Sequence, residues 1–228
     1  MSQPSAVNRA GAYHHGNLRA ALVAAALELV AEKGVTGLSV AEAARRTGVS
    51  TAAPYRHFAS RAALLSAAAT VAGRELLTQL QAAIEDVREQ GGGGGDEVSF
   101  AVEALAATAR AYVTFALTRG AAFELVFADE LQDFPDEERR EVTRRVFDVL
   151  LWPAIAVTGS PAGAERLLRG YTAVAHGYAY LPRSGFMRGY NTDVDLVAGE
   201  AANVVRTLAR SAAEDASTAD DSSKPTVY

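Results

Sequence analysis

Residues 38–61 read LSVAEAARRTGVSTAAPYRHFASR. Ser39 and Glu42 stand three residues apart in the capping-box pattern that opens a helix, and Gly48 is typical of the end of one. After the turn Gly-Val-Ser, a second short helix is predicted from Thr51 to Phe58. Two helices at this spacing have the dimensions of a helix-turn-helix, but many helical bundles contain the same corner. The spacing alone therefore leaves DNA binding and plain packing equally open.

The segments on either side of this stretch complete a small bundle. Apolar residues recur at three- and four-residue steps from Asn17 to Lys33, which predicts an amphipathic first helix that ends at Gly34. Ser60 is placed to cap a long fourth helix that reaches about residue 89. The first part of the chain is thus predicted to be a three-helix bundle with a helix-turn-helix, joined by the fourth helix to the rest.

The rest of the chain is also predicted to be helical. Gly91 to Gly95 are five consecutive glycines, which indicate a flexible loop because each ordered glycine loses much backbone entropy. Residues 212–228, rich in Ser, Asp, Ala and Thr, are predicted to be a disordered tail. The fold class is all-α with about nine helices. The helices beyond the glycines are predicted at about residues 96–118, 121–131, 136–157, 162–181 and 192–211.

Charge is divided unevenly along the chain. The formal net charge is −5, yet residues 1–80 hold eight basic and four acidic side chains, which leaves the excess of acid in the remainder. In a chain with a basic head and an acidic body, only the head attracts phosphate. A chance fluctuation in the distribution of charged residues would give the same pattern. The absence of cysteine excludes disulfides, a thiolate nucleophile and cysteine-ligated metal sites. No leader or membrane span is predicted, so we expect a cytoplasmic protein.

Several motifs lie close together over about residues 13–75. They are Tyr13-His14-His15-Gly16-Asn17-Leu18-Arg19, Leu38 to Ala44, Thr47-Gly48-Val49-Ser50, Pro54-Tyr55-Arg56-His57-Phe58 and Ser60-Arg61. Together they resemble the TetR family of bacterial regulators. The resemblance implies a DNA-binding domain at residues 13–75 and a C-terminal effector-binding and dimerisation domain at residues 76–211. It also implies a double-stranded DNA operator as partner and a homodimer formed through the last two helices.

The residues expected to meet DNA lie between the second helix and the start of the fourth. Small side chains suit close approach to base edges, whereas tyrosine, arginine and histidine suit phosphate oxygens. By the resemblance, Tyr55 and His57 contact phosphate, and Arg61 replaces the family's usual lysine. The predicted DNA-binding set is Ser39, Arg45, Arg46, Ser50, Thr51, Ala52, Ala53, Tyr55, Arg56, His57 and Arg61.

These assignments have structural alternatives. Tyr55 could be a core residue with its hydroxyl at the rim, and Arg45 and Arg46 could be a solvated helix end. Pro54 departs from a regular recognition helix, because proline disfavours helical angles in the residue before it. Either the first turn is irregular or the helix begins later, which puts base contacts by Thr51 and its neighbours in question.

No catalytic or metal site is predicted. Adjacent His14 and His15 point in opposite directions on an extended chain, and no carboxylate lies near them in sequence. No nucleophile with a base, carboxylate pair or phosphate-cradling loop is recognisable, so we expect neither an enzyme nor a cofactor. The alternative to a DNA-binding regulator is an all-helical protein-interaction module whose corner only resembles the motif.

The acidic body is expected to sense a small, largely apolar molecule. Ala175-His176-Gly177 is similar to a His-Gly signature of one C-terminal subclass, although Tyr171-Thr172 stand where that subclass has tryptophan. Bulky side chains would line the pocket, with His176 or Tyr171 as polar anchors, or would simply form core. The predicted pocket set is Phe115, Phe123, Phe127, Trp152, Tyr171, His176 and Tyr178.

The expected function is that of a ligand-responsive repressor. A homodimer would bind a palindromic operator, and effector binding would tilt the fourth helix and change the separation of the recognition helices. By the resemblance, the ligand-free form is the one that binds DNA, although the family also includes activators. The apolar residues predicted for the dimer face are Leu196, Val197, Ala201, Val204, Val205 and Leu208.

Overall fold

The computed structural model describes residues 18–91, 95–184 and 189–222, and these parts hold helices and turns but no strand. Three short 3₁₀ turns tighten the loops: η2 (Val35–Gly37), η3 (Pro54–Arg56) and η4 (Asp129–Leu131). The α-helices are α1 (Leu18–Lys33), α2 (Val40–Arg46), α3 (Arg61–Glu89), α4 (Glu97–Thr118), α5 (Gly120–Val126), α6 (Glu137–Thr158), α7 (Pro161–Tyr180) and α8 (Val194–Ser222).

Side-chain caps fix the start of four long helices. The Oγ of Ser60 accepts a hydrogen bond from the backbone N–H of Ala63 at 3.1 Å, so α3 begins where the sequence predicted. Asp96, Asp136 and Ser160 cap α4, α6 and α7 in the same way. Each cap satisfies one of the N–H groups that a helix leaves without an internal partner.

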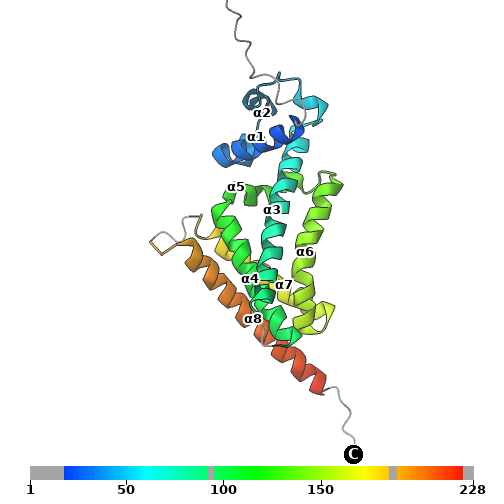
Figure 1. Ribbon diagram of the computed structural model, residues 1–228, viewed down its shortest axis with the longest axis vertical. Coiled ribbons are helices and arrows are strands. Elements are labelled where there is room, and N and C mark those ends of the chain that lie inside the picture. The colour runs from blue at the N-terminus through cyan, green and yellow to red at the C-terminus, as the bar shows by residue number, and fades with distance from the viewer. Residues whose placement is uncertain (1–17, 92–94, 185–188, 223–228) are drawn as a thin grey trace, which may run out of the picture.

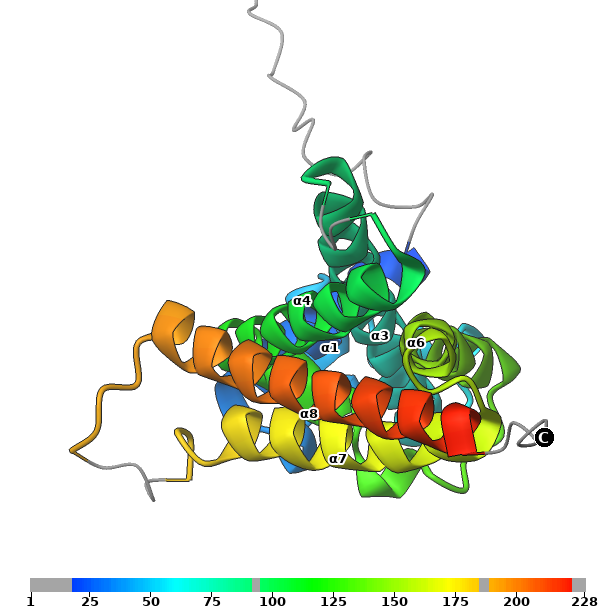
Figure 2. The ribbon, with the colours of Figure 1, turned by 90° about the horizontal axis from the view of Figure 1, so that it is seen from below.

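The helices form a head and a body that share α3 (Figure 1). The head contains α1, α2 and η3, and α3 continues from it into the body, where it packs against α4 and α6. Figure 2 shows α7 and α8 side by side as an outer layer, and α8 also packs on α4. The predicted all-α architecture, with an N-terminal helical head and a long connecting helix, is confirmed.

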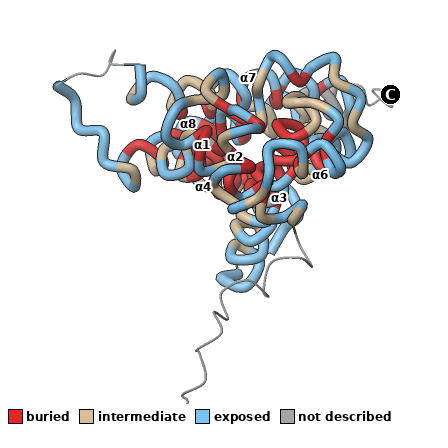
Figure 3. Tube along the Cα trace, turned by 90° about the horizontal axis from the view of Figure 1, so that it is seen from above, coloured by how far each residue is buried: buried red, intermediate tan, exposed pale blue. Residues whose placement is uncertain are grey.

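One hydrophobic core runs through both parts. Leu22 and Leu29 of α1 are fully buried in the head, together with Leu64 near the start of α3. Farther along α3, Leu76 and Leu80 are fully buried within the body. Seen from above in Figure 3, buried stretches of the chain gather around α1, α2 and α4, and exposed stretches surround them. Because burial of a leucine stabilises the fold by about 2 kcal/mol, α3 is held firmly both in the head and in the body.

Helix α4 is long and apolar enough to span a membrane, and α6 with α7 passes the same test only as a pair bent by 120°. In α4, however, 61% of the apolar window is buried inside the protein. Val113, Phe115 and most of its alanines are buried, and the helix packs against α3, α6, α7 and α8. The apolar composition of α4 therefore reflects its central position in the body.

Two sequence predictions differ from the structure. The segment predicted as a third helix, Thr51 to Phe58, contains only the turn η3, so the described residues hold eight α-helices rather than nine. The predicted disordered tail is wrong over residues 212–222, which continue α8. Ala212 and Ala213 pack against the core, and this contact extends the helix beyond the apolar stretch. Residues 223–228 lie outside the described parts.

Candidate nucleic-acid interface

The predicted capping box at the start of α2 forms only in half. The Oγ of Ser39 accepts the N–H of Glu42 at 3.4 Å, and Ser39 has the extended backbone angles of an N-cap. The carboxylate of Glu42 does not return to Ser39, because Arg45 donates to it at 2.6 and 3.0 Å. These bonds hold the pKa of the Glu42 carboxyl at about 2. Ser39 therefore has a structural role at the helix start.

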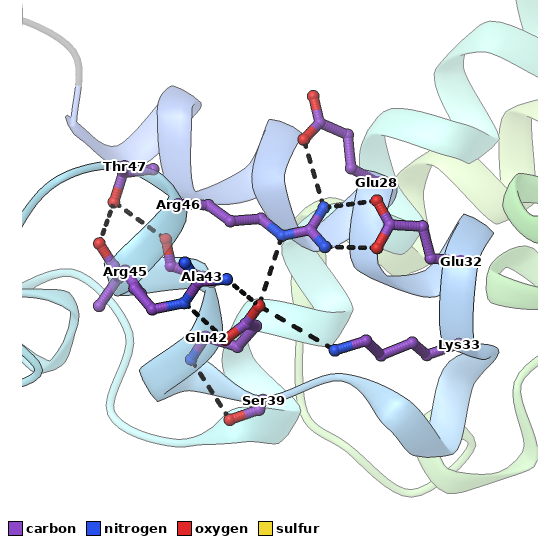
Figure 4. Close-up of polar contacts among 10 residues, drawn as sticks. Glu28, Glu32, Lys33, Ser39, Glu42, Ala43, Arg45, Arg46 and Thr47 are labelled. Carbon is purple, nitrogen blue, oxygen red and sulfur yellow. Dashed lines mark hydrogen bonds and ion pairs between the residues drawn. The ribbon is translucent and has the colours of Figure 1, made fainter.

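Arg46 is turned toward α1 and surrounded by carboxylates (Figure 4). It donates two hydrogen bonds to Glu32 and lies 3.6 Å from Glu28 and 3.8 Å from Glu42. Only 20% of its side chain is exposed, whereas 72% of the Arg45 side chain is exposed. The Arg46 guanidinium therefore ties α2 to α1, and its predicted DNA contact stays a prediction. A bidentate pair of this kind fixes geometry as well as charge.

The turn after α2 is set by Gly48, whose φ of 70° lies in the left-handed region that favours glycine. The Thr47 hydroxyl donates to the carbonyls of Ala43 and Ala44 at 3.0 Å and closes the end of α2. Val49 then donates its N–H to the Ala44 carbonyl. The chain is thereby redirected toward the segment that follows.

Pro54 explains why the following segment is not an α-helix. Proline has no N–H to donate to the carbonyl of Ser50, and its ring collides with that carbonyl in a regular helix. The Ser50 carbonyl instead accepts the N–H of Ala53 at 3.0 Å, and η3 begins at Pro54. Of the two alternatives raised by Pro54, the later start is the one observed, so Ser50, Thr51 and Ala52 precede the helical turn.

The turn η3 directs its polar side chains outward. Tyr55 is 58% exposed, and Arg56 and His57 are exposed beside it. Within the described parts of the chain, the side chain of Arg56 forms no hydrogen bond or ion pair, whereas its backbone N–H donates to the Ala53 carbonyl at 3.2 Å. Pro54 and Phe58 are buried on the other side of the turn, and the guanidinium of Arg19 lies 5.4 Å from the centre of the Phe58 ring. Tyr55 is therefore a surface residue, and its core alternative is wrong.

The remaining predicted contacts divide into two groups. Ser50, Thr51 and Ala52 are exposed and Ala53 is half-buried, so the first three form a continuous surface with η3. Arg61 is different, because its guanidinium donates to the carbonyls of Val35 and Leu38 and pairs with Glu130. In the chain without DNA the Arg61 guanidinium is therefore already bonded on three sides, and its predicted phosphate contact stays a prediction. The motif residues Tyr13 to Asn17 lie outside the described parts.

The predicted effector residues do not form one pocket. Phe123, Phe127 and His176 meet in a packed aromatic cluster with Tyr112, with ring centroids 4.9 to 6.2 Å apart. The Tyr112 hydroxyl lies 3.1 and 3.2 Å from the two ring nitrogens of His176. The sequence analysis missed Tyr112, because its place in the apolar helix α4 gave no signal of this contact.

The other members of the predicted set lie elsewhere. Phe115 is fully buried, and Tyr171 is buried with its hydroxyl beside Thr108. Tyr178 lines a surface groove between α7 and α8. Trp152 is 69% exposed at a separate groove of about 430 Å³ formed by α3, α4 and α6, which we call the Trp152 groove. The residues that line it include Gln81, Ile84, Arg88, Phe100, Val149 and Trp152.

Burial of the aromatic cluster predicts a pH-dependent stability. Burial lowers the pKa of His176 below its ordinary 6.5, so the unfolded chain binds a proton more readily than the folded protein. The free energy of unfolding should therefore fall as the pH drops through 6.5. In urea unfolding series from about pH 7 to 5, His176→Gln should flatten this decline. The exposed residue His57 supplies the control: if His57→Gln flattens the decline as much as His176→Gln, the assignment to His176 is wrong.

Comparison with known proteins agrees with both parts of the fold. The family model described as "Bacterial regulatory proteins, tetR family" matches residues 22–68. The model described as "Tetracyclin repressor-like, C-terminal domain" matches residues 105–205. The His-Gly subclass suggested by residues 175–177 stays a prediction. No curated protein sequence matches the chain significantly.

Solved structures share the architecture. A protein with unknown function from Rhodococcus sp. RHA1 is 30% identical, with a TM-score of 0.68 over 86% of this chain and 97% of that one. AibR, solved with isovaleryl coenzyme A and operator DNA, is 16% identical, with a TM-score of 0.57 over 82% and 97% of the two chains. The multidrug binding protein EbrR, complexed with imidazole, is 22% identical, with a TM-score of 0.54 over 83% and 93%. The chain belongs to the TetR family of bacterial transcriptional regulators and carries the family's N-terminal DNA-binding domain.

Proposed function

We propose that the protein is a ligand-responsive repressor that binds a palindromic operator as a homodimer and is released by a small, largely apolar molecule. The observation that carries the proposal is the outward-facing turn η3, where Tyr55, Arg56 and His57 are exposed together. We further propose residues 13–75 as the DNA-binding domain, residues 76–211 as the effector and dimerisation domain, and a cytoplasmic location.

The chemistry of η3 and the preceding turn suits the backbone of a DNA duplex. Arg56 brings an unpaired guanidinium, which matches phosphate oxygens or a guanine edge, and Tyr55 brings a hydroxyl donor. Thr51 and Ala52 are small and exposed, so the backbone beside them can approach the groove closely. AibR, which shares the fold, was solved with operator DNA, so a fold of this kind accommodates such a partner.

The test of DNA binding is a salt titration. Fluorescence anisotropy with DNA from upstream of the protein's own gene should give an affinity that falls steeply with salt. Arg56→Ala should reduce the slope by about one phosphate equivalent, because it removes one released counterion. Arg145→Ala, which removes an exposed arginine from α6 of the body, serves as the matched control and should leave the slope unchanged. Absence of binding by the wild-type protein at low salt would favour the protein-interaction module.

A homodimer is supported by the outer layer of α7 and α8. Leu196, Val204 and Leu208 of α8 are 43%, 37% and 36% exposed and point away from the body. The other predicted face residues, Val197, Ala201 and Val205, are buried against the chain's own core. The dimer face is therefore narrower than predicted. Gly170 of α7 lies beside Leu208 and offers no side chain, which would let a partner helix approach closely.

Charge placed on this face should break the dimer. Val204→Glu with Leu208→Glu would bury two carboxylates against apolar side chains of the second copy, which is unfavourable. Sedimentation at micromolar concentration should therefore detect a monomer, and operator affinity should fall with it. Val98→Glu changes an equally exposed apolar residue on α4 and should leave the dimer intact. A monomeric wild-type protein would contradict the proposal.

The Trp152 groove is the site we favour for the effector. It has apolar walls from Ile84, Phe100 and Val149, and Arg88 stacks over the Phe100 ring at 5.6 Å. Such a mixture of aromatic surface with a few polar groups is typical of small-molecule sites. AibR and EbrR were each solved with a small molecule, which supports the same role for this body.

Trp152 is the only tryptophan of the chain and reports directly on this groove. The uncharged apolar dye N-phenyl-1-naphthylamine should bind saturably and accept energy from Trp152. Ala156→Phe, which fills the groove, should abolish this transfer while Trp152 remains. Ala31→Phe, on the exposed side of α1, is the control and should leave the energy transfer unchanged. Equal transfer in the Ala156 variant would place the dye elsewhere and remove the groove from the proposal.

A further inference from the structure

Arg61 joins the head to the body at the first turn of α3. Its Nε donates to the Leu38 carbonyl at 2.9 Å, and one terminal nitrogen donates to the Val35 carbonyl at 2.5 Å. The other terminal nitrogen pairs with the Glu130 carboxylate at 2.6 Å. The Arg61 side chain is 33% exposed, so these bonds are better shielded from solvent than those of a fully exposed pair.

The partners of Arg61 come from two distant stretches of chain. Val35 and Leu38 belong to the link between α1 and α2, and Leu38 immediately precedes the capping residue Ser39. Glu130 belongs to η4, which follows directly on α5. Helix α5 begins the segment that supplies Phe123 and Phe127 to the aromatic cluster of the body. Arg61 thus connects the start of α2 with the segment that leads out of this cluster.

The shape of arginine suits this position. A guanidinium is planar and carries five N–H donors, so it can serve acceptors in several fixed directions at once. A lysine ammonium is a compact charge without this fork and could not hold both carbonyls and Glu130 in the same geometry. Arg61 also adds to the hydrogen bonds of the link itself: the Val35 carbonyl accepts the backbone N–H of Leu38 at 3.3 Å in addition to the guanidinium, so removing Arg61 weakens the turn η2 without leaving that carbonyl unbonded.

We infer that Arg61 is a positioning residue that couples η4 of the body to the helix-turn-helix, and that it does not contact DNA. A displacement of η4 moves Glu130, and through Arg61 it shifts Leu38 and the start of α2. The inference rests on the proposed function in one respect: its first test measures operator affinity, and so requires that the protein binds DNA. A phosphate contact at Arg61 is the competing role, and the two roles predict opposite effects of removing Glu130.

Operator affinity should therefore be measured over a salt series for Arg61→Ala, Glu130→Ala and the double variant. If Arg61 couples the two parts, each single variant weakens binding about tenfold with an unchanged salt slope, and the double variant is no weaker than either. If Arg61 contacts phosphate, Glu130→Ala tightens binding by freeing the arginine, and Arg61→Ala lowers the slope by about one. The latter result would overturn the inference.

Two further variants guard against misfolding. Glu130 is 40% exposed at its side chain, so its replacement disturbs the core little. Arg61→Lys keeps the positive charge: it should behave like Glu130→Ala if Arg61 has the coupling role, and like wild type if it contacts phosphate. Glu138→Ala breaks the exposed Arg74–Glu138 pair between α3 and α6 and is the matched control, which should leave affinity unchanged.

A second readout does not need DNA. Hydrogen exchange of residues 34–41 in the free protein should speed up severalfold in Glu130→Ala but not in Glu138→Ala, because only Glu130 holds Arg61 against this link. Unchanged exchange in Glu130→Ala would contradict the coupling. If the wild-type protein binds no DNA and exchange still increases, the coupling stands and the proposed function fails.

Discussion

The structure depends on the burial of α3 between Leu64 and Leu80, where the helix passes from the head into the body. Near its start, Leu64 and Leu65 are buried in the head, and near its middle Leu76 and Leu80 are buried in the body. A helix of 29 residues extends about 43 Å, so a single rigid element joins the two parts. Any rearrangement of the body that tilts α3 must therefore move the head, and this constraint makes a ligand-responsive regulator mechanically feasible.

Three arginines of the head illustrate how the same side chain takes different roles. Arg46 is enclosed by the carboxylates of α1 and α2, Arg61 bonds to the carbonyls of the link between them, and Arg56 faces solvent. The first two hold the helix-turn-helix together, and the third is left for an external anion. The basic character of the head is thus divided between internal cohesion and the candidate DNA surface, so the net charge of the segment overstates its free positive charge.

Local signals in the sequence predicted the fold well, whereas the placement of side chains needed the structure. Capping by Ser39 and Ser60 is local chemistry, so the starts of α2 and α3 could be read directly. The partners of Arg46 lie up to 18 residues away, so nothing near it in sequence distinguished it from Arg56. The predicted effector residues lie apart for a similar reason, because the orientation of each helix decides where its side chains lie. Trp152 lies at a surface groove, whereas the others lie in the core, in the aromatic cluster or at the α7–α8 surface. The extent of α8 depended on packing of alanines that composition could not show.

Contact between η3 and the duplex is the claim that can be tested most directly. A photoreactive benzophenone side chain in place of Tyr55 would be irradiated in the presence of upstream DNA, with the same group in place of Trp152 as the control. The account predicts a DNA cross-link from position 55 that competitor operator removes, and none from position 152. Equal cross-linking at both positions, or none at position 55 while DNA remains bound, would contradict it.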